Sequence, residues 1–544
     1  MKRIICIAVL AFFITGSTIA QNKEIKNVIL LIPDGTSLSV VSAARWYQRY
    51  NHPEITQLRI DPYLCGTVLT YSSNAPIGDS APTTSCYMTG YPSRAGYVAT
   101  YPPADPMNDI IPMDSNRAYQ PMMTVLEAAR ITRNKSSGLV FTCEFPHATP
   151  ADCASHTYNR SKYEWIIPQM VHNNLDVVIG GGAGLLTDNH KQFLQDEGYG
   201  VFLNEIDSFR NYKGNRMWAL FGNTDMAYDI DRDSTKEPSL AEMTQKAIEK
   251  LSKNKNGFFL MVEGSKVDWA AHANDPVALI TDMLAFDKAC GVALDFAEAD
   301  GKTVVVVVSD HGNSGFSIGS NKCPNYTTLT KDELFGPVSK FKTSIYKLIS
   351  ELHGTDPAGL RDVFNNLTGI SLSDSDYNKI LQCVDYKRST LPEDKRVKGM
   401  YLTKIVTDIA DNATCFGFTT TGHTGEEVFL AVYDPTPHRL IGHYTNIELN
   451  RYLCNATGLK QSLESLTDNY FAKHTEVFKN YTYTLLNNNG NSELKVTNKD
   501  KILEILPNTN IVKLNGKEIK LKSVAVFVDK NETFYLPRSL KDLL

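Results

Sequence analysis

The sequence has no Cys-x-x-Cys pair, no long run of basic residues and no internal repeat. The missing cysteine pairs argue against a zinc site built from thiolates. Acidic and basic residues nearly balance, with 60 Asp and Glu against 55 Lys and Arg, so the net charge of -5 gives no indication of a nucleic-acid partner. With 42% apolar and 21% charged residues, the composition is that of an ordinary soluble globular protein.

Long apolar segments are absent outside the N-terminus, where the basic head Met1-Lys2-Arg3 precedes the run IICIAVLAFFI. A Thr18-x-Ala20 signature follows, and together these features predict a secretory signal peptide at residues 1–20, cleaved after Ala20. A membrane anchor is the weaker alternative, because the run is too short to span a bilayer comfortably. We expect an exported mature chain, periplasmic or extracellular, with no membrane span.

Cysteines are few, and their number in the predicted mature chain is odd. Of the ten, Cys6 lies in the predicted signal peptide, which leaves nine: Cys65, Cys86, Cys143, Cys153, Cys290, Cys323, Cys383, Cys415 and Cys454. At least one thiol is therefore free if disulfides form, and the pairing stays open. Cys86 and Cys290 fall in apolar helical patterns, so we expect small buried hydrophobic residues there.

Short continuous apolar runs recur along the chain and alternate with helical patterns. The clearest runs are residues 27–32, 138–142, 176–182, 257–262, 303–309 and 428–433. Runs of this length suit strands that are buried on both faces. Residues 121–131 and 276–297 have helical spacing instead. The sequence therefore predicts an α/β fold, with a mostly parallel central sheet and helices on both of its faces.

Two stretches break this alternation. Residues 314–415 contain no strong strand and several helix-like pieces, which predicts a lid-like or crown-like insertion. After about Gly458, short alternating runs and turns predict a small β-rich C-terminal extension. We expect a signal peptide at 1–20, a catalytic domain at 21–458 and the extension at 459–544. The extension is interpreted as a structural addition, with retention at a surface as the alternative.

The segment IGDSAPTTSCYMTG, residues 77–90, places Ser80 at the start of a predicted helix. Asp79 or Ser80 could simply cap that helix, since both side chains accept hydrogen bonds from free backbone N–H groups. Alternatively, Ser80 could be a nucleophile aimed at an anion that the same N–H groups attract. In this second interpretation Asp79 is the better candidate for the cap.

Acidic residues follow three of the predicted strands at the point where each strand ends. Asp34 follows the run at 27–32, Glu263 follows the run at 257–262, and Asp310-His311 follows the run at 303–309. Carboxyl ends of parallel strands meet at one edge of an open α/β sheet, where ligands bind. Asp268 and His272 lie four residues apart and would share one face of a helix. This mixture of Asp and His suits zinc, while Asp, Glu and Thr oxygens suit magnesium.

These segments together resemble the alkaline phosphatase family over residues from about 26 to 458. The similar stretches are NVILLIPDG, GDSAPTTSCYMTG, PHATPADCASHTYNR, VEGSKVDWAAH, VVVSDHG and TTTGHTGEEVFLAVYDP. The resemblance implies an α/β enzyme with two zinc ions and one magnesium ion. It assigns Asp268, His272 and His423 to the first zinc, and Asp34, Asp310 and His311 to the second. Magnesium would be held by Asp34, Thr149 and Glu263.

The same resemblance implies roles for four further residues. Ser80 would be the nucleophile that becomes phosphorylated, and Arg160 would bind the phosphate. His147 would neighbour the magnesium site, and with Trp269 it would tune magnesium binding and phosphate release. Pro82 and Thr84 replace small residues of the family pattern, which we expect to change packing rather than chemistry.

The resemblance therefore implies an exported phosphomonoesterase that acts on small phosphate monoesters through a phosphoserine, with a homodimer as its expected assembly. A phosphodiesterase or nucleotide pyrophosphatase is the nearest alternative, but such enzymes generally use Thr as nucleophile and lack the magnesium and arginine half of the site. A sulfatase would need a Cys-x-Pro-x-Arg type motif, which does not occur. A phosphate-binding protein without turnover is the alternative from another class, and it would need no nucleophile.

Overall fold

The computed structural model describes residues 24–323, 325–384, 400–488 and 491–544. The predicted signal peptide at residues 1–20 lies outside the described residues. Within the described part of the chain, no helix is both long enough and apolar enough to cross a membrane.

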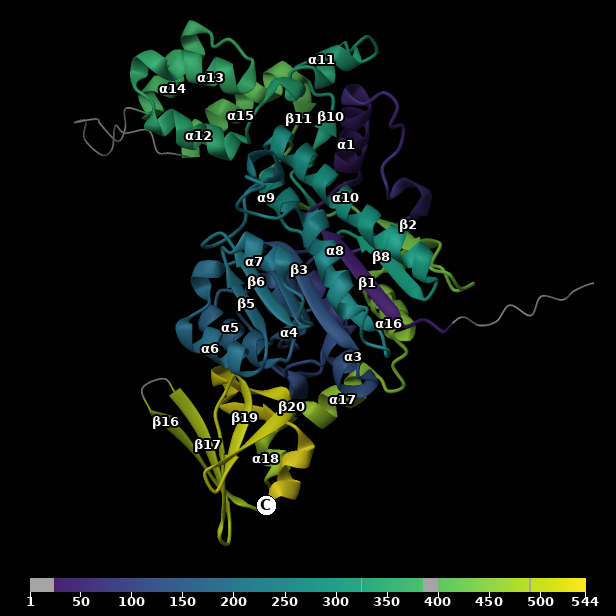
Figure 1. The fold of residues 1–544 in the computed structure, drawn as a ribbon, viewed down its shortest axis with the longest axis vertical. Coiled ribbons are helices and arrows are strands. Elements are labelled where there is room, and N and C mark those ends of the chain that lie inside the picture. Colours follow the sequence, from purple (N-terminus) through teal and green to yellow (C-terminus); the bar gives the residue numbers. More distant parts are fainter. Residues whose placement is uncertain (1–23, 324, 385–399, 489–490) are drawn as a thin grey trace, which may run out of the picture.

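A ten-stranded sheet runs through the middle of the molecule, in the order β14-β2-β13-β8-β1-β7-β3-β4-β6-β5 (Figure 1). Its strands are β1 (Asn27–Pro33), β2 (Leu64–Leu69), β3 (Ser136–Glu144), β4 (Val177–Gly181), β5 (Gly200–Leu203), β6 (Met217–Phe221), β7 (Phe258–Gly264), β8 (Thr303–Val308), β13 (Val428–Tyr433) and β14 (Gly442–Thr445). Neighbouring strands are parallel except where β13 pairs antiparallel with β2 and β8. The predicted mostly parallel α/β fold is confirmed.

Both faces of the sheet are covered, as predicted. On β1, Ile29 and Leu31 point into one hydrophobic core, whereas Val28, Leu30 and Ile32 point into the other. The first core is covered by α1 (Leu38–Asn51), α8 (Leu240–Leu251) and α10 (Pro276–Asp300); the second by α2 (Ser80–Thr89), α3 (Val125–Arg133), α4 (Ala148–Ala154) and α16 (Asn446–Thr457). Successive side chains of a strand alternate between faces, so a continuous apolar run requires two cores.

The structure differs from the predicted helix boundaries at one helix start. The pattern at 121–131 forms α3 only from Val125, because Thr124 and Glu127 make a capping box that begins the helix there. Two further helices, α6 (Asp188–Asp196) and α7 (Ile206–Asn211), lie beside the edge strand β5.

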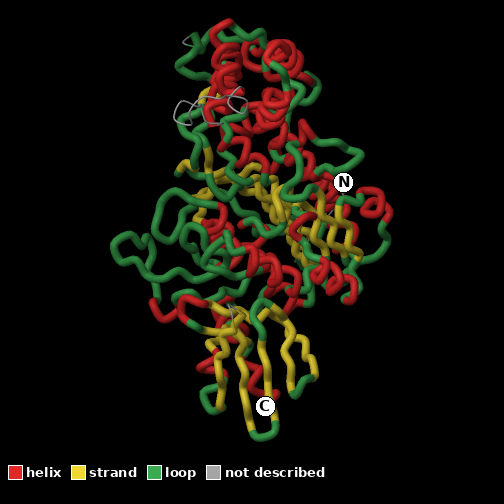
Figure 2. The backbone as a smooth tube through the Cα atoms, turned by 90° about the vertical axis from the view of Figure 1, so that its left-hand side faces the viewer, coloured by secondary structure: helices red, strands yellow, loops and turns green. Residues whose placement is uncertain are grey.

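The predicted insertion is largely helical and lies at one end of the molecule (Figures 1 and 2). It contains α11 (Lys331–Phe335), α12 (Ile345–Gly354), α13 (Leu360–Thr368), α14 (Asp374–Val384) and α15 (Met400–Thr414). At its base, β10 (Ser317–Ile318) pairs with β11 (Phe416–Gly417), and a disulfide joins Cys323 to Cys415. This answers the pairing that the sequence left open, and Cys86 and Cys290 are buried free thiols as expected.

The C-terminal part is β-rich, as predicted, and lies at the opposite end from the insertion (Figure 2). Seven antiparallel strands form it in the order β15-β21-β20-β19-β18-β17-β16. They are β15 (Ala472–Lys473), β16 (Thr482–Asn488), β17 (Asn491–Asn498), β18 (Lys501–Ile505), β19 (Thr509–Leu514), β20 (Lys517–Val528) and β21 (Thr533–Leu536), with α17 (Leu463–Tyr470) and α18 (His474–Val477) beside them. Helix α5 (Tyr163–His172) packs against β19 and so connects this sheet to the larger one.

Candidate active site

Three adjacent strands of the large sheet deliver acidic side chains to one edge. β8, β1 and β7 are neighbours in the sheet, and Asp310, Asp34 and Glu263 stand at their carboxyl ends, all fully buried. Gly35 follows Asp34 with a φ of +59°, and a Cβ at this position would lie 2.2 Å from Asp268 Oδ1. Only glycine permits the acidic groups to approach this closely.

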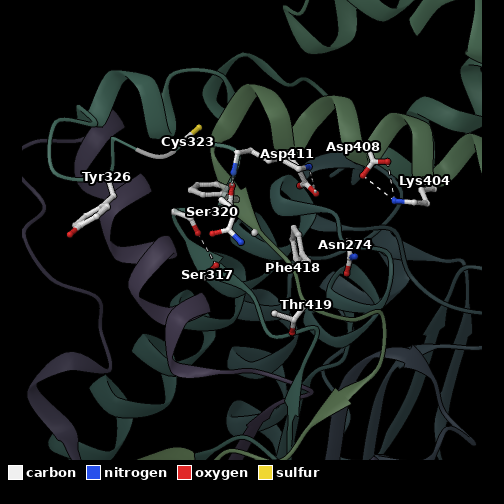
Figure 3. A pocket seen from close by; sticks show the side chains of 15 residues that line it. Asn274, Ser317, Ser320, Cys323, Tyr326, Lys404, Asp408, Asp411, Phe418 and Thr419 are labelled. Carbon is white, nitrogen blue, oxygen red and sulfur yellow. Dashed lines mark hydrogen bonds and ion pairs between the residues drawn. The ribbon is translucent and has the colours of Figure 1, made fainter.

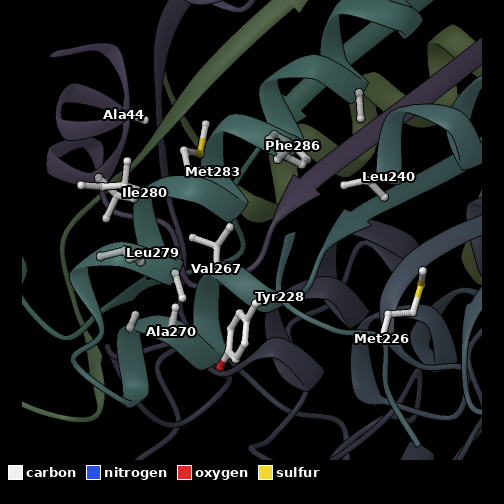
Figure 4. Packing of buried hydrophobic residues seen from close by; sticks show 14 of the residues in the cluster. Ala44, Met226, Tyr228, Leu240, Val267, Ala270, Leu279, Ile280, Met283 and Phe286 are labelled. Carbon is white, nitrogen blue, oxygen red and sulfur yellow. The ribbon is translucent and has the colours of Figure 1, made fainter. Parts of the chain in front are cut away.

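Helix α9 (Lys266–His272) carries the next two predicted residues. Its Val267 and Ala270 pack into the core against α10 (Figure 4). Asp268 and His272 are four residues apart and come together, with His272 Nε2 3.4 Å from Asp268 Oδ2. The core contact thus fixes the helix face that carries these two candidate ligand side chains.

His423 joins them from the far end of the insertion. It lies on the short strand β12 (His423–Thr424), which pairs antiparallel with β9 (Gly312–Asn313) directly after Asp310-His311. This pairing brings His423 Nε2 to 3.1 Å from His272 Nε2 and to 3.7 Å from Asp268 Oδ1.

The three histidines are oriented in the same way. The Nδ1 atom of His272 donates to the Thr421 carbonyl oxygen at 2.6 Å, that of His423 to the Gly78 carbonyl oxygen at 2.9 Å, and that of His311 to the Gly312 carbonyl oxygen at 3.1 Å. Since a carbonyl oxygen can only accept, each neutral ring carries its proton on Nδ1 and turns a bare Nε2 toward the site. Imidazoles held in this way are typical of metal ligands.

The geometry groups these side chains into two candidate cation sites. Asp268, His272 and His423 form one group, and Asp34, Asp268 and His311 form the other, with the ligand atoms of each within 4.8 Å of one another. Asp268 therefore belongs to both groups. The predicted ligand Asp310 lies nearby, with its Oδ2 3.6 Å from His311 Nε2.

The carboxylates of this cluster carry more negative charge than the neighbouring side chains neutralise. Burial and the neighbouring Asp310 and Asp268 carboxylates raise the pKa of Asp34 well above its ordinary value. Burial opposes a charged His311, but the carboxylates of Asp310 and Asp34 outweigh it and raise the pKa of His311. Bound cations would relieve this repulsion, and the donor set of carboxylates and imidazoles fits zinc.

A third candidate cation site lies beside Glu263. Thr149 Oγ1 and Glu263 Oε1 are buried and make no hydrogen bond within the described residues. Burial, followed by the charge of Asp310, raises the pKa of Glu263 to about 8. Hydroxyl and carboxylate oxygens without partners fit a hard cation such as magnesium.

His147 lies beside this third candidate site and shares a group of possible ligand atoms with Glu263. Its Nε2 accepts from Arg160 Nη2 at 2.9 Å, and burial with the Arg160 charge lowers the pKa of His147 to about 3, so the ring is neutral. Trp269 lies against His147, with ring centroids 5.9 Å apart. The structure thus brings both predicted neighbours of the third site together.

Ser80 begins α2 and faces the histidine and carboxylate cluster. Its Oγ lies 3.3 Å from His311 Nε2 and 3.4 Å from Asp34 Oδ1. The position is 2% exposed, so a group bound here would be largely shielded from water.

Asp79 occupies the N-cap position of α2, but its side chain makes no capping hydrogen bond, so the expected capping role is wrong. Pro82 stands at the third helical position and has no N–H to offer. Asp79 instead accepts from Arg160 Nη1 at 2.9 Å. Burial favours a neutral Asp79, yet the Arg160 charge lowers its pKa below the ordinary value. The residue thus holds the predicted phosphate-binding arginine beside Ser80.

Two polar residues in the site were not predicted. Asn313 Nδ2 donates to Asp268 Oδ1 at 2.6 Å, and its position just after the Asp310-His311-Gly312 segment could have indicated it. Cys143 Sγ lies 3.4 Å from Glu263 Oε2 and shares a candidate metal-binding group with His147 and Glu263. Nothing in the apolar pattern of its strand distinguishes this cysteine from a core residue.

Comparison with known proteins decides the family. The profile described as alkaline phosphatase matches residues 25–459. The chain belongs to the alkaline phosphatase family. Alkaline phosphatase 3 of Bacillus subtilis is 31% identical over 450 residues, which cover 80% of this chain and 90% of that protein. Members of this family are phosphomonoester hydrolases that depend on metal ions, so the chain is an enzyme of this class.

Solved alkaline phosphatases have the same fold. The cold-active alkaline phosphatase of a psychrophilic Shewanella is 25% identical with a TM-score of 0.68, and the match covers 80% of this chain and all of that one. A variant of the alkaline phosphatase from the Antarctic bacterium TAB5, 24% identical with a TM-score of 0.53, has Mg bound in its M3 site, and the match covers 81% of this chain and all of that one. Both matches leave about a fifth of this chain uncovered.

Proposed function

We propose that this chain is an exported alkaline phosphatase that hydrolyses phosphate monoesters through a phosphoserine at Ser80. The observation that carries the proposal is the placement of Ser80 Oγ beside His311 and Asp34, with Arg160 held next to it by Asp79. A nucleophilic oxygen, convergent ligand atoms and a guanidinium are the parts that phosphoryl transfer needs.

Two zinc ions and one magnesium ion are the proposed cofactors. Asp268, His272 and His423 would hold one zinc, Asp34, Asp310 and His311 the other, and Asp34, Thr149 and Glu263 the magnesium. When bound, these ions supply the positive charge that a phosphate dianion and its transition state require. The bare Nε2 atoms and the unpartnered oxygens of Thr149 and Glu263 support this assignment.

The chain's own residues perform the remaining work. Arg160 presents a fork of N–H donors that matches two phosphate oxygens. Ser80 Oγ attacks phosphorus as its hydroxyl loses a proton, the bond from phosphorus to the ester oxygen breaks, and the leaving alcohol gains a proton. Water then attacks the phosphoserine, which restores the Ser80 hydroxyl and releases inorganic phosphate. His147 stays neutral and steadies Arg160 through its Nε2.

A phosphodiesterase or nucleotide pyrophosphatase is the second candidate. The complete half-site of Thr149, Glu263 and Arg160 beside a serine favours monoesters over diesters. Rates on p-nitrophenyl phosphate, its bis ester and its sulfate would separate these activities, and we expect the monoester to react fastest.

Export and domain division are part of the same proposal. The signal-like residues 1–20 support export, and the Cys323–Cys415 disulfide suits an oxidising compartment. We assign residues 21–458 to the catalytic domain, with the insertion at 314–415, and residues 459–544 to the extension. Small phosphate monoesters are the proposed substrates, and a homodimer is the proposed assembly.

Acid quench during turnover tests the proposed mechanism. With a phosphate-labelled monoester we expect label on Ser80, found by peptide mapping, and no label after Ser80→Ala. Chelation should abolish hydrolysis, and zinc plus magnesium should restore it. An enzyme that hydrolyses the ester without labelling any serine, or that is indifferent to chelators, would contradict the proposal.

A further inference from the structure

A cavity of about 840 Å³ lies between the insertion and the body of the enzyme (Figure 3). Asn274 comes from the body, Phe418 and Thr419 come from the segment that leads to His423, and Asp411 comes from α15 of the insertion. The cavity therefore has walls from both parts of the chain.

The cavity is connected to the candidate active site along two segments. Asn274 follows His272 by two residues, and Thr419 precedes His423 by four. The Thr421 carbonyl oxygen, between Thr419 and His423, accepts from His272 Nδ1 at 2.6 Å. Two segments of the cavity wall thus continue directly into His272 and His423 of the candidate site.

One oxygen of a buried acid in the cavity wall has no hydrogen-bond partner among the described residues. Asp411 is 6% exposed, and its Oδ1 makes no hydrogen bond to any described residue. Among the described residues, the other oxygen of Asp411 faces Lys322 Nζ at 4.0 Å. Lys404 forms its ion pair with Asp408 instead, at 2.9 Å. A buried polar atom without a partner is expensive, so a ligand hydroxyl group that reaches this enclosed oxygen, once the Asp411 carboxyl group turns toward the cavity, would remove that cost.

An aromatic ring completes the recognition surface. Phe418 is partly buried, packs on Phe316 with ring centroids 5.2 Å apart, and lines the cavity with Asp411 (Figure 3). A carboxylate that accepts from hydroxyl groups, next to an apolar ring face, suits a sugar ring better than a hydrocarbon chain.

We propose that this cavity receives the alcohol part of the ester, and that it favours a sugar ring whose free hydroxyl groups donate to Asp411. The inference rests on the proposed function, because it places the leaving group of that reaction. Ribose of a nucleoside monophosphate and a hexose phosphate share this chemistry.

The test compares adenosine 5′-monophosphate and glucose 6-phosphate with p-nitrophenyl phosphate, which has no free hydroxyl group. Asp411→Ala should lower kcat/KM for at least one sugar ester by roughly tenfold, as loss of a hydrogen bond does, and leave p-nitrophenyl phosphate within about twofold. The sugar ester that loses more identifies the source. Asp376→Ala, at a position that lies in the insertion but does not line the cavity, is the matched control.

Two outcomes would overturn the inference: equal losses on all three esters, which indicate a structural role for Asp411, or no loss on any. If none of the esters is hydrolysed by the wild-type enzyme, the proposed function itself has failed. Inhibition by adenosine and glucose, weakened in Asp411→Ala, provides a readout that does not depend on ester hydrolysis.

A separate observation concerns the C-terminal extension and the loop that carries Arg160. Asp529 of the extension accepts from Tyr158 Oη at 2.7 Å and pairs with Lys162 Nζ at 3.1 Å. Tyr158 and Lys162 stand two residues before and two residues after Arg160. One carboxylate of the extension therefore contacts a residue on each side of Arg160 in the chain.

The rest of the loop is held by the catalytic domain. The Arg160 backbone N–H donates to the Gly96 carbonyl oxygen at 2.7 Å, and Lys162 Nζ lies 3.4 Å from the centroid of the Trp165 ring. Asp529 adds the bond that fixes the Tyr158 side chain and orients the Lys162 ammonium group.

We infer that Asp529 is a positioning residue for Arg160, so that the extension takes part in phosphate binding without touching phosphate. This inference also rests on the proposed role of Arg160. Small displacements of a positioning group weaken binding of the group it aligns.

Asp529→Ala should raise the inhibition constant of inorganic phosphate and the KM for p-nitrophenyl phosphate together, by roughly threefold to tenfold, with a smaller change in kcat. Asp529→Asn should recover part of the loss, since its amide oxygen can still accept from Tyr158. The matched control is Lys520→Ala, which breaks the ion pair of the extension with Glu197, away from the arginine loop.

If Asp529→Ala and Lys520→Ala shift phosphate inhibition equally, the effect belongs to the domain contact in general and the inference is wrong. Unchanged phosphate inhibition in Asp529→Ala would also overturn it. Arg160→Ala is the reference: if that variant keeps wild-type phosphate affinity, the assignment of Arg160 in the proposed function has failed instead.

Discussion

At the scale of single residues, the site depends on which atoms of each side chain already make a hydrogen bond within the protein. Backbone carbonyl oxygens take up Nδ1 of His272, His311 and His423, and so select the tautomer that presents a bare Nε2. In the same way, the Asp79 carboxylate pairs with Arg160, so the start of α2 has no side-chain cap. The N–H groups of Ser80 and Ala81 thereby stay available to an anion.

Ser80→Ala tests the nucleophile. Turnover of p-nitrophenyl phosphate should fall by at least about a thousandfold, because no other side-chain oxygen replaces the lost nucleophile. Metal content should stay near the wild-type level, since the carboxylate and imidazole side chains of the candidate ligand groups are all kept. Thr84→Ala, on the same helix, removes a buried hydroxyl without a partner and should keep activity. Wild-type turnover in Ser80→Ala would contradict the assignment.

His423→Ala tests the first cation site. We expect metal analysis of the purified variant to find about one zinc fewer per chain, because one of three ligand side chains is missing. The exposed His443 on β14 supplies the control, and His443→Ala should keep the full metal content. Equal zinc content in the two variants would show that His423 is not a ligand.

At the scale of helices and strands, short elements place the decisive residues. The two-residue pairing of β9 with β12 carries His423 to the site, and α9 is oriented by the packing of its apolar side on α10 (Figure 4). Asp275 then links α10 to the insertion: its side chain caps α10 through Val277 and Ala278 N–H groups, and it accepts from Ile345 N–H of α12 at 2.7 Å.

The pH dependence of stability tests this link. Burial raises the pKa of Asp275 to about 6, above the value of about 4 expected in the unfolded chain, so the folded protein binds the extra proton. The stability from Asp275 is therefore fully present below about pH 4 and is lost as the pH rises through 6. The advantage of wild type over Asp275→Asn should shrink between pH 4.5 and 7.5, by up to roughly 3 kcal/mol. Urea denaturation at both pH values measures it, and a constant or growing advantage would contradict the assignment.

At the scale of the whole molecule, the large sheet carries the proposed site. The insertion and the C-terminal extension each connect to a segment that carries proposed site residues. The insertion is closed at its base by Cys323–Cys415 and leads directly into the segment of His423. The extension reaches the arginine loop through Asp529. The insertion and the extension, at opposite ends of the molecule in Figure 1, are therefore both linked to segments that carry proposed site residues.

Loss of the disulfide tests how the insertion supports the site. The bond closes a loop with a sequence separation of 92 residues, for which chain entropy predicts a loss of about 4–5 kcal/mol on removal. Cys323→Ser should therefore unfold at a lower temperature than the wild type under oxidising conditions. Reductant should lower the wild-type midpoint to that of the variant and leave the variant unchanged. Equal midpoints without reductant would show that the bond contributes nothing.

Much of this enzyme follows from local sequence. The six apolar runs became strands of a sheet that is covered on both faces. There every side chain meets a core, and the neighbouring strands satisfy the backbone N–H and C=O groups. The order of the acids after 27–32, 257–262 and 303–309 placed Asp34, Glu263 and Asp310 at one edge, since parallel strands end on the same side. The fold class and the family followed from these patterns.

Only the tertiary structure decided the contacts between segments far apart in the chain. It set Asp79 against Arg160 rather than on the end of α2 and placed Asp268 in two candidate ligand groups. It brought Asn313 to Asp268 and Cys143 to Glu263. It also joined Cys323 to Cys415 and Asp529 to the arginine loop. Local patterns determine which elements form because the forces within an element are short-ranged. The partner of each polar side chain depends instead on packing among elements that no local window contains.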